Sequence, residues 1–137
     1  MRQKKFKLQR GQALVTLLFF MIIAITVTSA AVVIIFNNSV SAQKLEEGTL
    51  TYYIAQSGAE NAILRLLRNP NYCGETLPID TGTAAITVVD GAGGCNGISP
   101  ITVTSTGTSG DFQRKIQVVA TYVSNVLTVT SWKEIYL

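Results

Sequence analysis

The sequence predicts an α+β fold in which a long N-terminal transmembrane α-helix packs on a C-terminal antiparallel β-sheet of about four strands. Three observations lead to this prediction: an uncharged apolar run near the start, helical periodicity that continues after it, and alternating strand-like segments in the second half. The expected parts are a leader at 1–11, a transmembrane helix half at 12–36, an exported amphipathic helix half at 37–69 and a β-rich head at 70–137.

The apolar run from Ala13 to Phe36 is long enough to cross a membrane. It has 24 residues without a charge, whereas a helix needs about 20 to span a hydrocarbon core of roughly 30 Å. Every backbone amide in lipid must be bonded within the segment, which only a helix achieves in a single span. We therefore expect one transmembrane helix here.

The distribution of charge predicts the orientation of this helix. The net charge is +3, but five of the 11 basic residues lie among the first ten positions. The rest of the chain has six basic and eight acidic residues, a net charge of −2. Basic residues before the span hold the N-terminus in the cytoplasm, so we expect an N-in/C-out topology with the head outside. No cationic surface for a phosphate backbone is expected, and so no direct binding of nucleic acid.

Two simpler interpretations of the N-terminus remain. A secretory signal peptide could be cleaved near Val40-Ser41-Ala42 or Ser29-Ala30-Ala31, although its apolar region usually has only 7–15 residues. An uncleaved signal anchor would keep the basic segment attached.

The composition disfavours enzymes. With no histidine and only two cysteines, the chain cannot build Ser-His-Asp or Cys-His catalysis, or a zinc site of the usual Cys/His type. We predict no catalytic residue, metal or cofactor. A carboxylate-based hydrolase is the remaining enzyme class, but the adjacent Glu46 and Glu47 project to different sides of a helix and make a poor acid/base pair.

The segment Gln9-Arg10-Gly11-Gln12-Ala13-Leu14-Val15 resembles the class III leader of type IV pilins and pseudopilins, in which a glycine separates a basic leader from an apolar run. The resemblance implies cleavage by a prepilin peptidase directly after Gly11, and N-methylation of Gln12 as the new terminus. It also implies other pilins or pseudopilins, a membrane platform protein, an assembly ATPase and membrane lipid as partners.

Two positions differ from the major subunits of that family. Gln12 stands where they usually have phenylalanine, and Thr16 stands where they have the glutamate that pairs with the terminal amine of a neighbouring subunit. PilX-type minor pilins and the tip pseudopilin of type II secretion are similar in lacking this glutamate. The stretch from Tyr53 to Arg65 resembles the small-residue region after the membrane helix in these proteins, and Ser131-Trp132-Lys133-Glu134 adds to the likeness.

The resemblance implies a minor pilin or pseudopilin, a structural subunit of a type IV pilus or type II secretion pseudopilus. It would reside in the cytoplasmic (inner) membrane and then in a pilus or pseudopilus at the cell surface or in the periplasm. The alternative function is an uncleaved, membrane-anchored extracytoplasmic binding module.

The exported residues predict a helix followed by a sheet. Apolar and small residues recur at three- and four-residue steps, which marks one buried helix face, and the helix should end at Asn69-Pro70-Asn71. The members of this stripe are Tyr52, Ala55, Ala59, Ala62, Ile63 and Leu66. Strands are expected at 84–89, 101–106, 112–122 and 126–135, and in the third of these Ile116, Val118, Ala120 and Tyr122 should face the helix.

Cys73 and Cys95 lie in the exported part, where a disulfide is the expected state and two free thiols are the alternative. The glycine-rich stretch 91–94 lacks the lysine and the strand-to-helix context of a phosphate-binding loop, so we expect a turn. Arg114 and Lys115 should belong to a solvated face rather than to an anion site.

Overall fold

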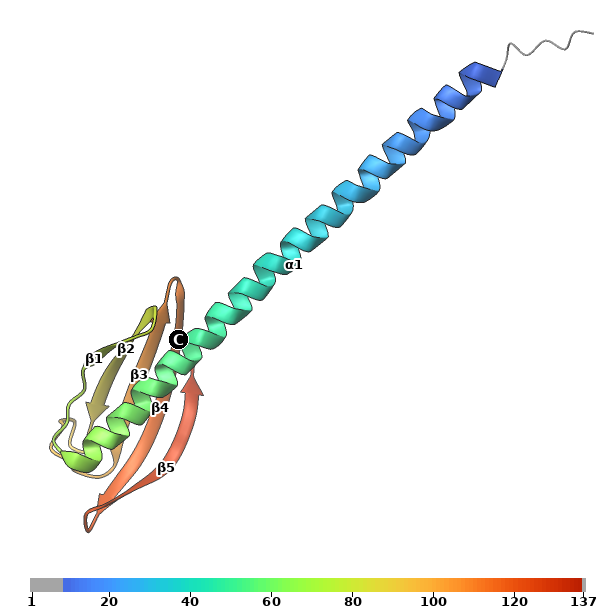
Figure 1. Cartoon of the computed structure of the whole chain (residues 1–137). Coiled ribbons are helices and arrows are strands. Elements are labelled where there is room, and N and C mark those ends of the chain that lie inside the picture. The colour runs from blue at the N-terminus through green and yellow to red at the C-terminus, as the bar shows by residue number, and fades with distance from the viewer. Residues whose placement is uncertain (1–8, 137) are drawn as a thin grey trace, which may run out of the picture. The chain divides into compact units, whose positions relative to one another are not determined.

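The computed structural model describes residues 9–136, which form one helix and a five-stranded sheet (Figure 1). The elements are α1 (Gln9–Arg68), β1 (Thr76–Ile79), β2 (Gly82–Val89), β3 (Ile101–Ser109), β4 (Phe112–Val123) and β5 (Val126–Ile135). The strands pair in chain order and every pair is antiparallel, so the sheet is a meander. The predicted α+β fold, with a long helix packed on an antiparallel sheet, is confirmed.

The chain divides into two compact units, residues 1–43 and 44–137. The described part of the first unit consists of the N-terminal part of α1 alone, whose side chains from residue 11 to 39 are exposed. The second unit contains the rest of α1 and all five strands. The hydrophobic core therefore belongs to the second unit.

The end of α1 agrees with the sequence. The helix ends at Arg68, directly before Asn69-Pro70, because proline disfavours helical angles in the residue that precedes it. The amide of Asn69 still donates to the carbonyl of Arg65 at 2.8 Å, so one more hydrogen bond closes the last turn. Two basic residues, Arg65 and Arg68, lie in this turn, where they interact favourably with the unpaired carbonyls.

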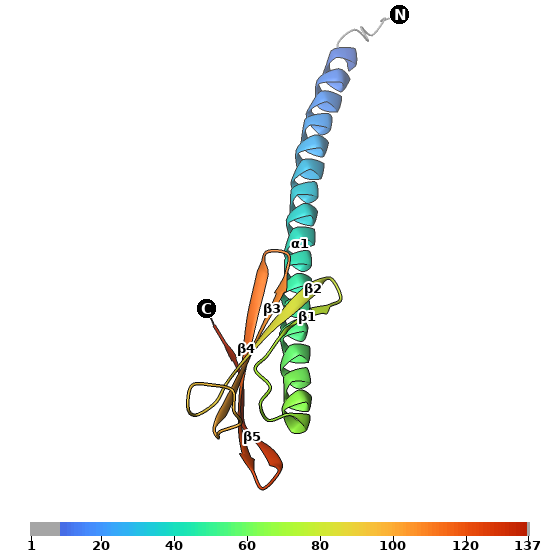
Figure 2. The same ribbon diagram turned by 90° about the vertical axis from the view of Figure 1, so that its left-hand side faces the viewer.

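The C-terminal part of α1 packs along one face of the sheet (Figure 2). From the predicted helix stripe, Ala55, Ala59, Ala62 and Leu66 are fully buried. Alternate residues of three strands complete this core, and they are Ile86 and Val88 of β2, Ile101 and Val103 of β3, and Ile116 and Val118 of β4. The predicted inward face of β4 is thus confirmed, and Tyr122 also packs against this core.

Glycines allow the backbones of the helix and of the sheet to approach each other closely. A methyl group on Gly58 of α1 would lie 2.7 Å from the Cβ of Ala84 and would overlap the hydroxyl of Ser105. On the opposite side of the contact, a methyl group on Gly107 of β3 would lie 2.6 Å from the backbone nitrogen of Ala55. Real Cβ contacts are essentially never this short, so both positions exclude a side chain.

The prediction of about four strands is wrong, because β1 was missed. Its sequence is Thr-Leu-Pro-Ile, and proline within a short run argues against a strand. Pro78 is tolerated because β1 is the edge strand of the sheet, where a residue without an amide hydrogen leaves no neighbour unpaired. A tight turn through Asp80, whose φ of 53° is left-handed, then joins β1 to β2.

The other boundaries differ by a few residues. β2 begins at Gly82 rather than at 84, β3 continues to Ser109 rather than to 106, and β4 ends at Val123 rather than at 122. The predicted bounds of β5 agree with the structure. The Ser124-Asn125 turn between β4 and β5 has positive φ at both residues, as a two-residue hairpin requires.

The glycine contact generates a prediction with a matched control on the same helix. Gly58→Ala should lower the free energy of unfolding of the head by about 1–2 kcal/mol, because overpacking outweighs the gain in helix propensity. Gly48→Ala should instead raise it by up to about 1 kcal/mol, since a methyl group there meets no atom within 4 Å. Denaturant unfolding of the full chain in detergent micelles, followed by the fluorescence of the single tryptophan, Trp132, measures both. Equal effects of the two substitutions would contradict the proposed contact.

Candidate functional site

The predicted processing site lies at the start of the described chain. Gly11 and Gln12 are both in α1 and both exposed, and a methyl group on Gly11 would meet no atom within 4 Å. Residues 1–8 of the predicted leader lie outside the described residues. Gly11 therefore has no packing role within the described chain.

The hydroxyl groups of the apolar run are satisfied within the helix itself. Thr16 donates to the carbonyl oxygens of Ala13 at 2.9 Å and Gln12 at 3.1 Å. Thr26, Thr28 and Ser29, the only other polar residues between 13 and 36, likewise donate to carbonyls three or four residues earlier. In hydrocarbon an unpaired polar group is costly, and none of these four hydroxyls is left unpaired.

The same segment exposes its apolar side chains on all sides. Every large apolar side chain from Leu14 to Phe36 is between 46% and 74% exposed. Covering one such side chain contributes roughly 1.5–3 kcal/mol, so the sixteen together represent on the order of 30 kcal/mol. The helix is long and apolar enough to span a membrane. This surface requires lipid or protein around it.

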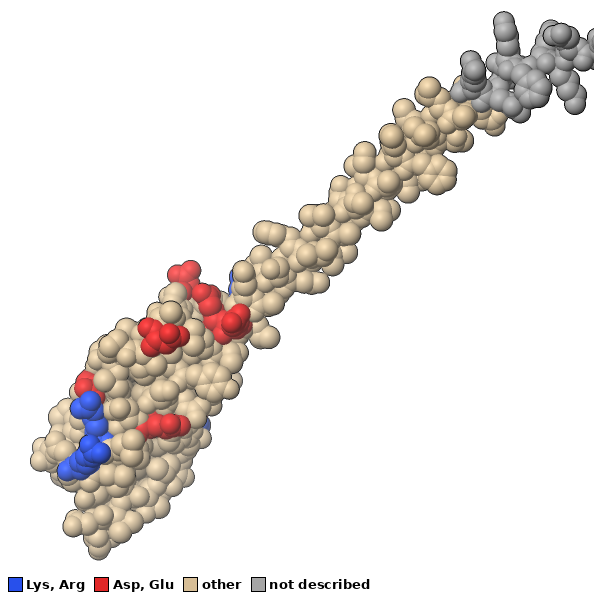
Figure 3. All heavy atoms as spheres, viewed as in Figure 1, with Lys and Arg blue, Asp and Glu red and all other residues tan. Residues whose placement is uncertain are grey.

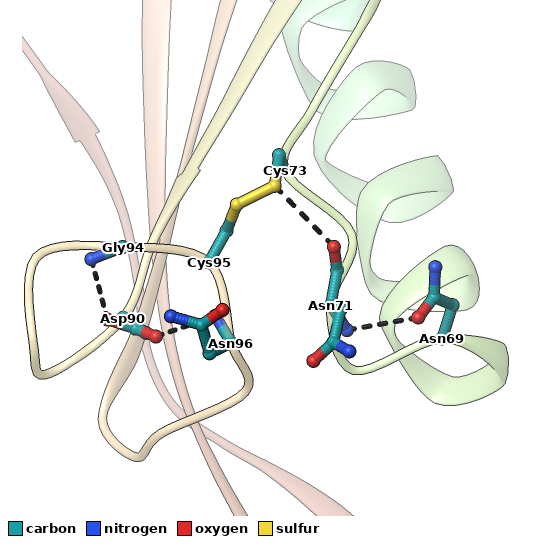
Figure 4. The surroundings of a disulfide bond; sticks show 7 residues. All are labelled: Asn69, Asn71, Cys73, Asp90, Gly94, Cys95 and Asn96. Carbon is teal, nitrogen blue, oxygen red and sulfur yellow. Dashed lines mark hydrogen bonds between the residues drawn. A yellow bond between two sulfur atoms is a disulfide. The ribbon is translucent and has the colours of Figure 1, made fainter.

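The disulfide joins two loops of the head (Figure 4). Cys73 lies in the segment that follows α1, and Cys95 lies in the loop between β2 and β3. Their Cα atoms are 5.2 Å apart, within the usual range for a disulfide. The carbonyl of Cys73 also accepts a hydrogen bond from Val88 at 3.2 Å, which holds the segment after α1 alongside β2. The predicted pairing of Cys73 with Cys95 is therefore present.

Asp90 organises the glycine-rich loop. Its carboxylate accepts a hydrogen bond from the amide of Ala92 at 2.9 Å. It also accepts from the amides of Gly94 at 2.8 Å and Asn96 at 2.7 Å, which Figure 4 shows. These donors, first of all Asn96, hold the pKa of the Asp90 carboxyl below its ordinary value. Within residues 91–94 two amides are thus bonded to this carboxylate and the other two to backbone carbonyls, which agrees with the turn predicted there.

A second cluster lies at the C-terminal end of α1. The Nε atom of Arg65 donates to Asn61 Oδ1 at 2.9 Å, and it lies 2.7 Å from Glu75 Oε1, with which it forms an ion pair. Tyr72 donates its hydroxyl to the same Glu75 oxygen at 2.9 Å, and the Arg65 guanidinium lies 5.7 Å from the centre of the Tyr72 ring. Burial and the hydrogen bond to Glu75 raise the pKa of Tyr72 to about 12, so this phenol stays protonated.

This cluster forms one wall of a surface hollow of about 480 Å³. Its lining residues are Asn61, Leu64, Arg65, Arg68, Asn69 and Tyr72. This hollow was not predicted from the sequence. Arg65 and Arg68 are three residues apart on a helix, which was a usable signal, but Tyr72 and Glu75 reach them only through the turn at Pro70.

Two of the remaining carboxylates bind neighbouring side chains. Glu134 of β5 pairs with Arg114 of β4 at 2.6 Å. Arg114 and Lys115 are adjacent in β4 and therefore point to opposite faces of the sheet, so they do not share the one solvated face that was predicted. Glu60 accepts a hydrogen bond from Gln56 at 3.0 Å on α1. Within residues 9–136 no three acidic or cysteine side chains come together in a way that could hold a metal ion.

Comparisons with protein-family models, with curated proteins and with solved structures give no match.

The disulfide generates a direct prediction. The double variant Cys73→Ser, Cys95→Ser should unfold with a free energy lower by roughly 3 kcal/mol, because the unfolded chain regains the entropy of a 22-residue loop. Denaturant titration measures the loss. Wild-type chain should also migrate faster on a gel without reductant than with it. Labelling of both thiols in unreduced, denatured wild-type chain would contradict the pairing.

The Asp90 loop generates a pH-dependent prediction. Because the folded-state pKa lies below the ordinary value of 3.8, the stability from Asp90 is present above pH 3.8 and is lost as the pH falls below it. Asp90→Asn should therefore be less stable than wild type at neutral pH, and this difference should shrink below pH 3.8. Thermal unfolding across pH 2–7 measures it.

A control for this experiment is Asp111→Asn, which changes an exposed acidic residue in the turn between β3 and β4. It should unfold like wild type at neutral pH. If Asp111→Asn loses as much stability at neutral pH as Asp90→Asn, removal of any negative charge has this effect, and the role given to Asp90 is refuted.

Proposed function

We propose that this chain is a minor pilin or pseudopilin, a structural subunit of a type IV pilus or type II secretion pseudopilus. The observation that carries the proposal is a helix with an apolar surface on all sides, which follows a basic segment ending in Gly11. Such a helix suits lipid before assembly and the helices of other subunits after it.

In this proposal the chain first resides in the cytoplasmic membrane with its N-terminus inside. A prepilin peptidase removes residues 1–11, and Gln12 becomes the methylated terminus. The head, stabilised by the Cys73–Cys95 disulfide, folds outside the cytoplasm, where disulfides persist. A platform protein and an assembly ATPase then drive the transfer of the helix from lipid into the filament.

Thr16 supports a minor rather than a major subunit. A carboxylate at this position could pair with the terminal amine of a neighbour, but a hydroxyl carries no charge. Its hydrogen bonds to Gln12 and Ala13 also direct it into its own helix. Contacts with neighbours would then depend on apolar packing.

Packing surface is also available on the part of α1 that belongs to the head. Tyr53, Leu64 and Leu67 lie on the side of the helix away from the sheet and are 58%, 60% and 49% exposed. Exposed large apolar groups on one helix side favour a partner there. A membrane-anchored binding module, the alternative function, would have no need of such a helix surface.

The test is processing by a prepilin peptidase. Co-expression should yield wild-type chain that lacks residues 1–11 and carries one added methyl group at Gln12, as measured by intact-mass spectrometry. Gly11→Ala should remain at full length, because the peptidase requires glycine there in the family that this leader resembles. Since a methyl group on Gly11 meets nothing within 4 Å, failure of cleavage would reflect recognition rather than misfolding.

Gly48→Ala serves as the matched control and should be cut like wild type. Wild-type chain that retains Met1 would instead favour an uncleaved anchored module. A new start at Gln43 would identify a secretory signal peptide. Either result would refute the pilin assignment.

A further inference from the structure

The hollow at the C-terminal end of α1 has the residues of a small-ligand site. Its volume of about 480 Å³ falls in the usual range for such sites, roughly 300–1,000 Å³. On the face drawn in Figure 3, basic side chains gather at this end of the helix beside an acidic group. Apart from Leu64, these residues are not needed for leader cleavage or for helix packing, so the proposed function leaves the polar side chains of the hollow unused.

Arg65 is held in place but keeps its terminal nitrogens available. Asn61 accepts a hydrogen bond from its Nε atom, Glu75 forms an ion pair with the same atom, and the centre of the Tyr72 ring lies 5.7 Å from the guanidinium. No hydrogen bond joins either Nη atom to the rest of residues 9–136. A guanidinium that is fixed at one edge and open at the other presents two parallel donors, an arrangement that matches a carboxylate.

Arg68 adds a second guanidinium to the same hollow. It is exposed, and it has no hydrogen bond or ion pair within residues 9–136. The amide side chains of Asn61 and Asn69 line the hollow beside it, and both can bond to hydroxyl groups. Leu64, which is 60% exposed, provides an apolar wall of the kind on which the face of a sugar ring packs.

The charge of the site favours a ligand with one negative charge. Arg65 and Arg68 contribute +2, Glu75 contributes −1, and the last carbonyls of α1 add about −0.5. The remaining positive charge is smaller than one unit. A carboxylate matches it, whereas a phosphate monoester carries about −1.5 to −2 at neutral pH.

We propose that this hollow, lined by Arg65, Arg68, Asn61, Asn69 and Leu64, binds an acidic sugar through its carboxylate, with a uronic acid as the ligand class. Arg65 and Arg68 bind the carboxylate, the two asparagines bind ring hydroxyls, and Leu64 contacts the ring face. The head would then contact uronate-containing polysaccharide. This inference does not depend on the pilin assignment, because it concerns the head alone.

The test is an NMR titration of the full ¹⁵N-labelled chain in detergent micelles with D-glucuronate. The expected result is saturable shifts of the amides of residues 61–72, with a dissociation constant on the order of 1 mM. D-Glucose lacks the carboxylate, acetate lacks the ring, and D-glucose 6-phosphate replaces the carboxylate by a phosphate. Each should bind at least about tenfold more weakly, since each loses one group of charged or polar contacts.

Two variants locate the site. Arg68→Gln should weaken glucuronate binding at least about tenfold without loss of folding, because Arg68 makes no contact that holds the head together. Lys133→Gln removes the same charge from β5, where Lys133 lies opposite Gln117 on the sheet face away from α1, and it should change binding less than about twofold.

Four results would overturn the proposal. They are glucose or acetate binding as tightly as glucuronate, glucose 6-phosphate binding more tightly, Arg68→Gln binding like wild type, and Lys133→Gln weakening binding as much as Arg68→Gln. Retention of the leader in the processing experiment would leave this titration unaffected, so failure of the one proposal is distinguishable from failure of the other.

Discussion

The head depends on a close contact between α1 and β3 that only small residues allow. Gly58 of the helix lies over Ala84 and Ser105, while Gly107 of β3 lies under the helix backbone at Ala55. Larger residues beside this contact, such as Leu66 and Ile116, then fill the space at either side. Because this contact determines which side of the helix meets the sheet, it also determines which side is left exposed.

The arrangement of the polar groups follows from that choice. With Ala59, Ala62 and Leu66 against the sheet, Leu64 lies on the outer side and Arg65 is exposed near the helix end. The turn at Pro70 then returns the chain so that Tyr72 and Glu75 reach Arg65. On the opposite side of the disulfide, Asp90 uses the free amides of its own loop. The two segments joined by Cys73 and Cys95 thus differ in chemistry: the segment after α1 contacts Arg65 through Tyr72 and Glu75, whereas the loop with Asp90 has its amide donors bonded internally.

Local patterns predicted most of this fold. The apolar run is recognised by its length of 24 residues. The buried faces of the helix and of β4 are recognised by their spacing, which is three or four residues for the alanines and two residues around Ile116. β1 could not be predicted in this way, because Pro78 is acceptable only at a sheet edge, and the edge is defined by pairing with β2. The contact of Glu75 with Arg65 could not be predicted either, because it depends on the tertiary structure and not on the spacing of the two residues in the sequence. Of the predicted site residues, the cysteines could be paired from their number and from the predicted export, whereas the roles of Gly11 and Gln12 rest on a resemblance.

The hydroxyl groups of the apolar run, which donate to backbone carbonyls of their own helix, also affect how freely this segment can rotate. Since Thr16, Thr26, Thr28 and Ser29 are bonded to their own turns, no side of this segment has a polar group that prefers a particular neighbour. Such a helix can rotate about its axis in lipid at little energetic cost. In the proposed filament, the rotation of this segment about its axis would then be determined by the shape of its surface alone.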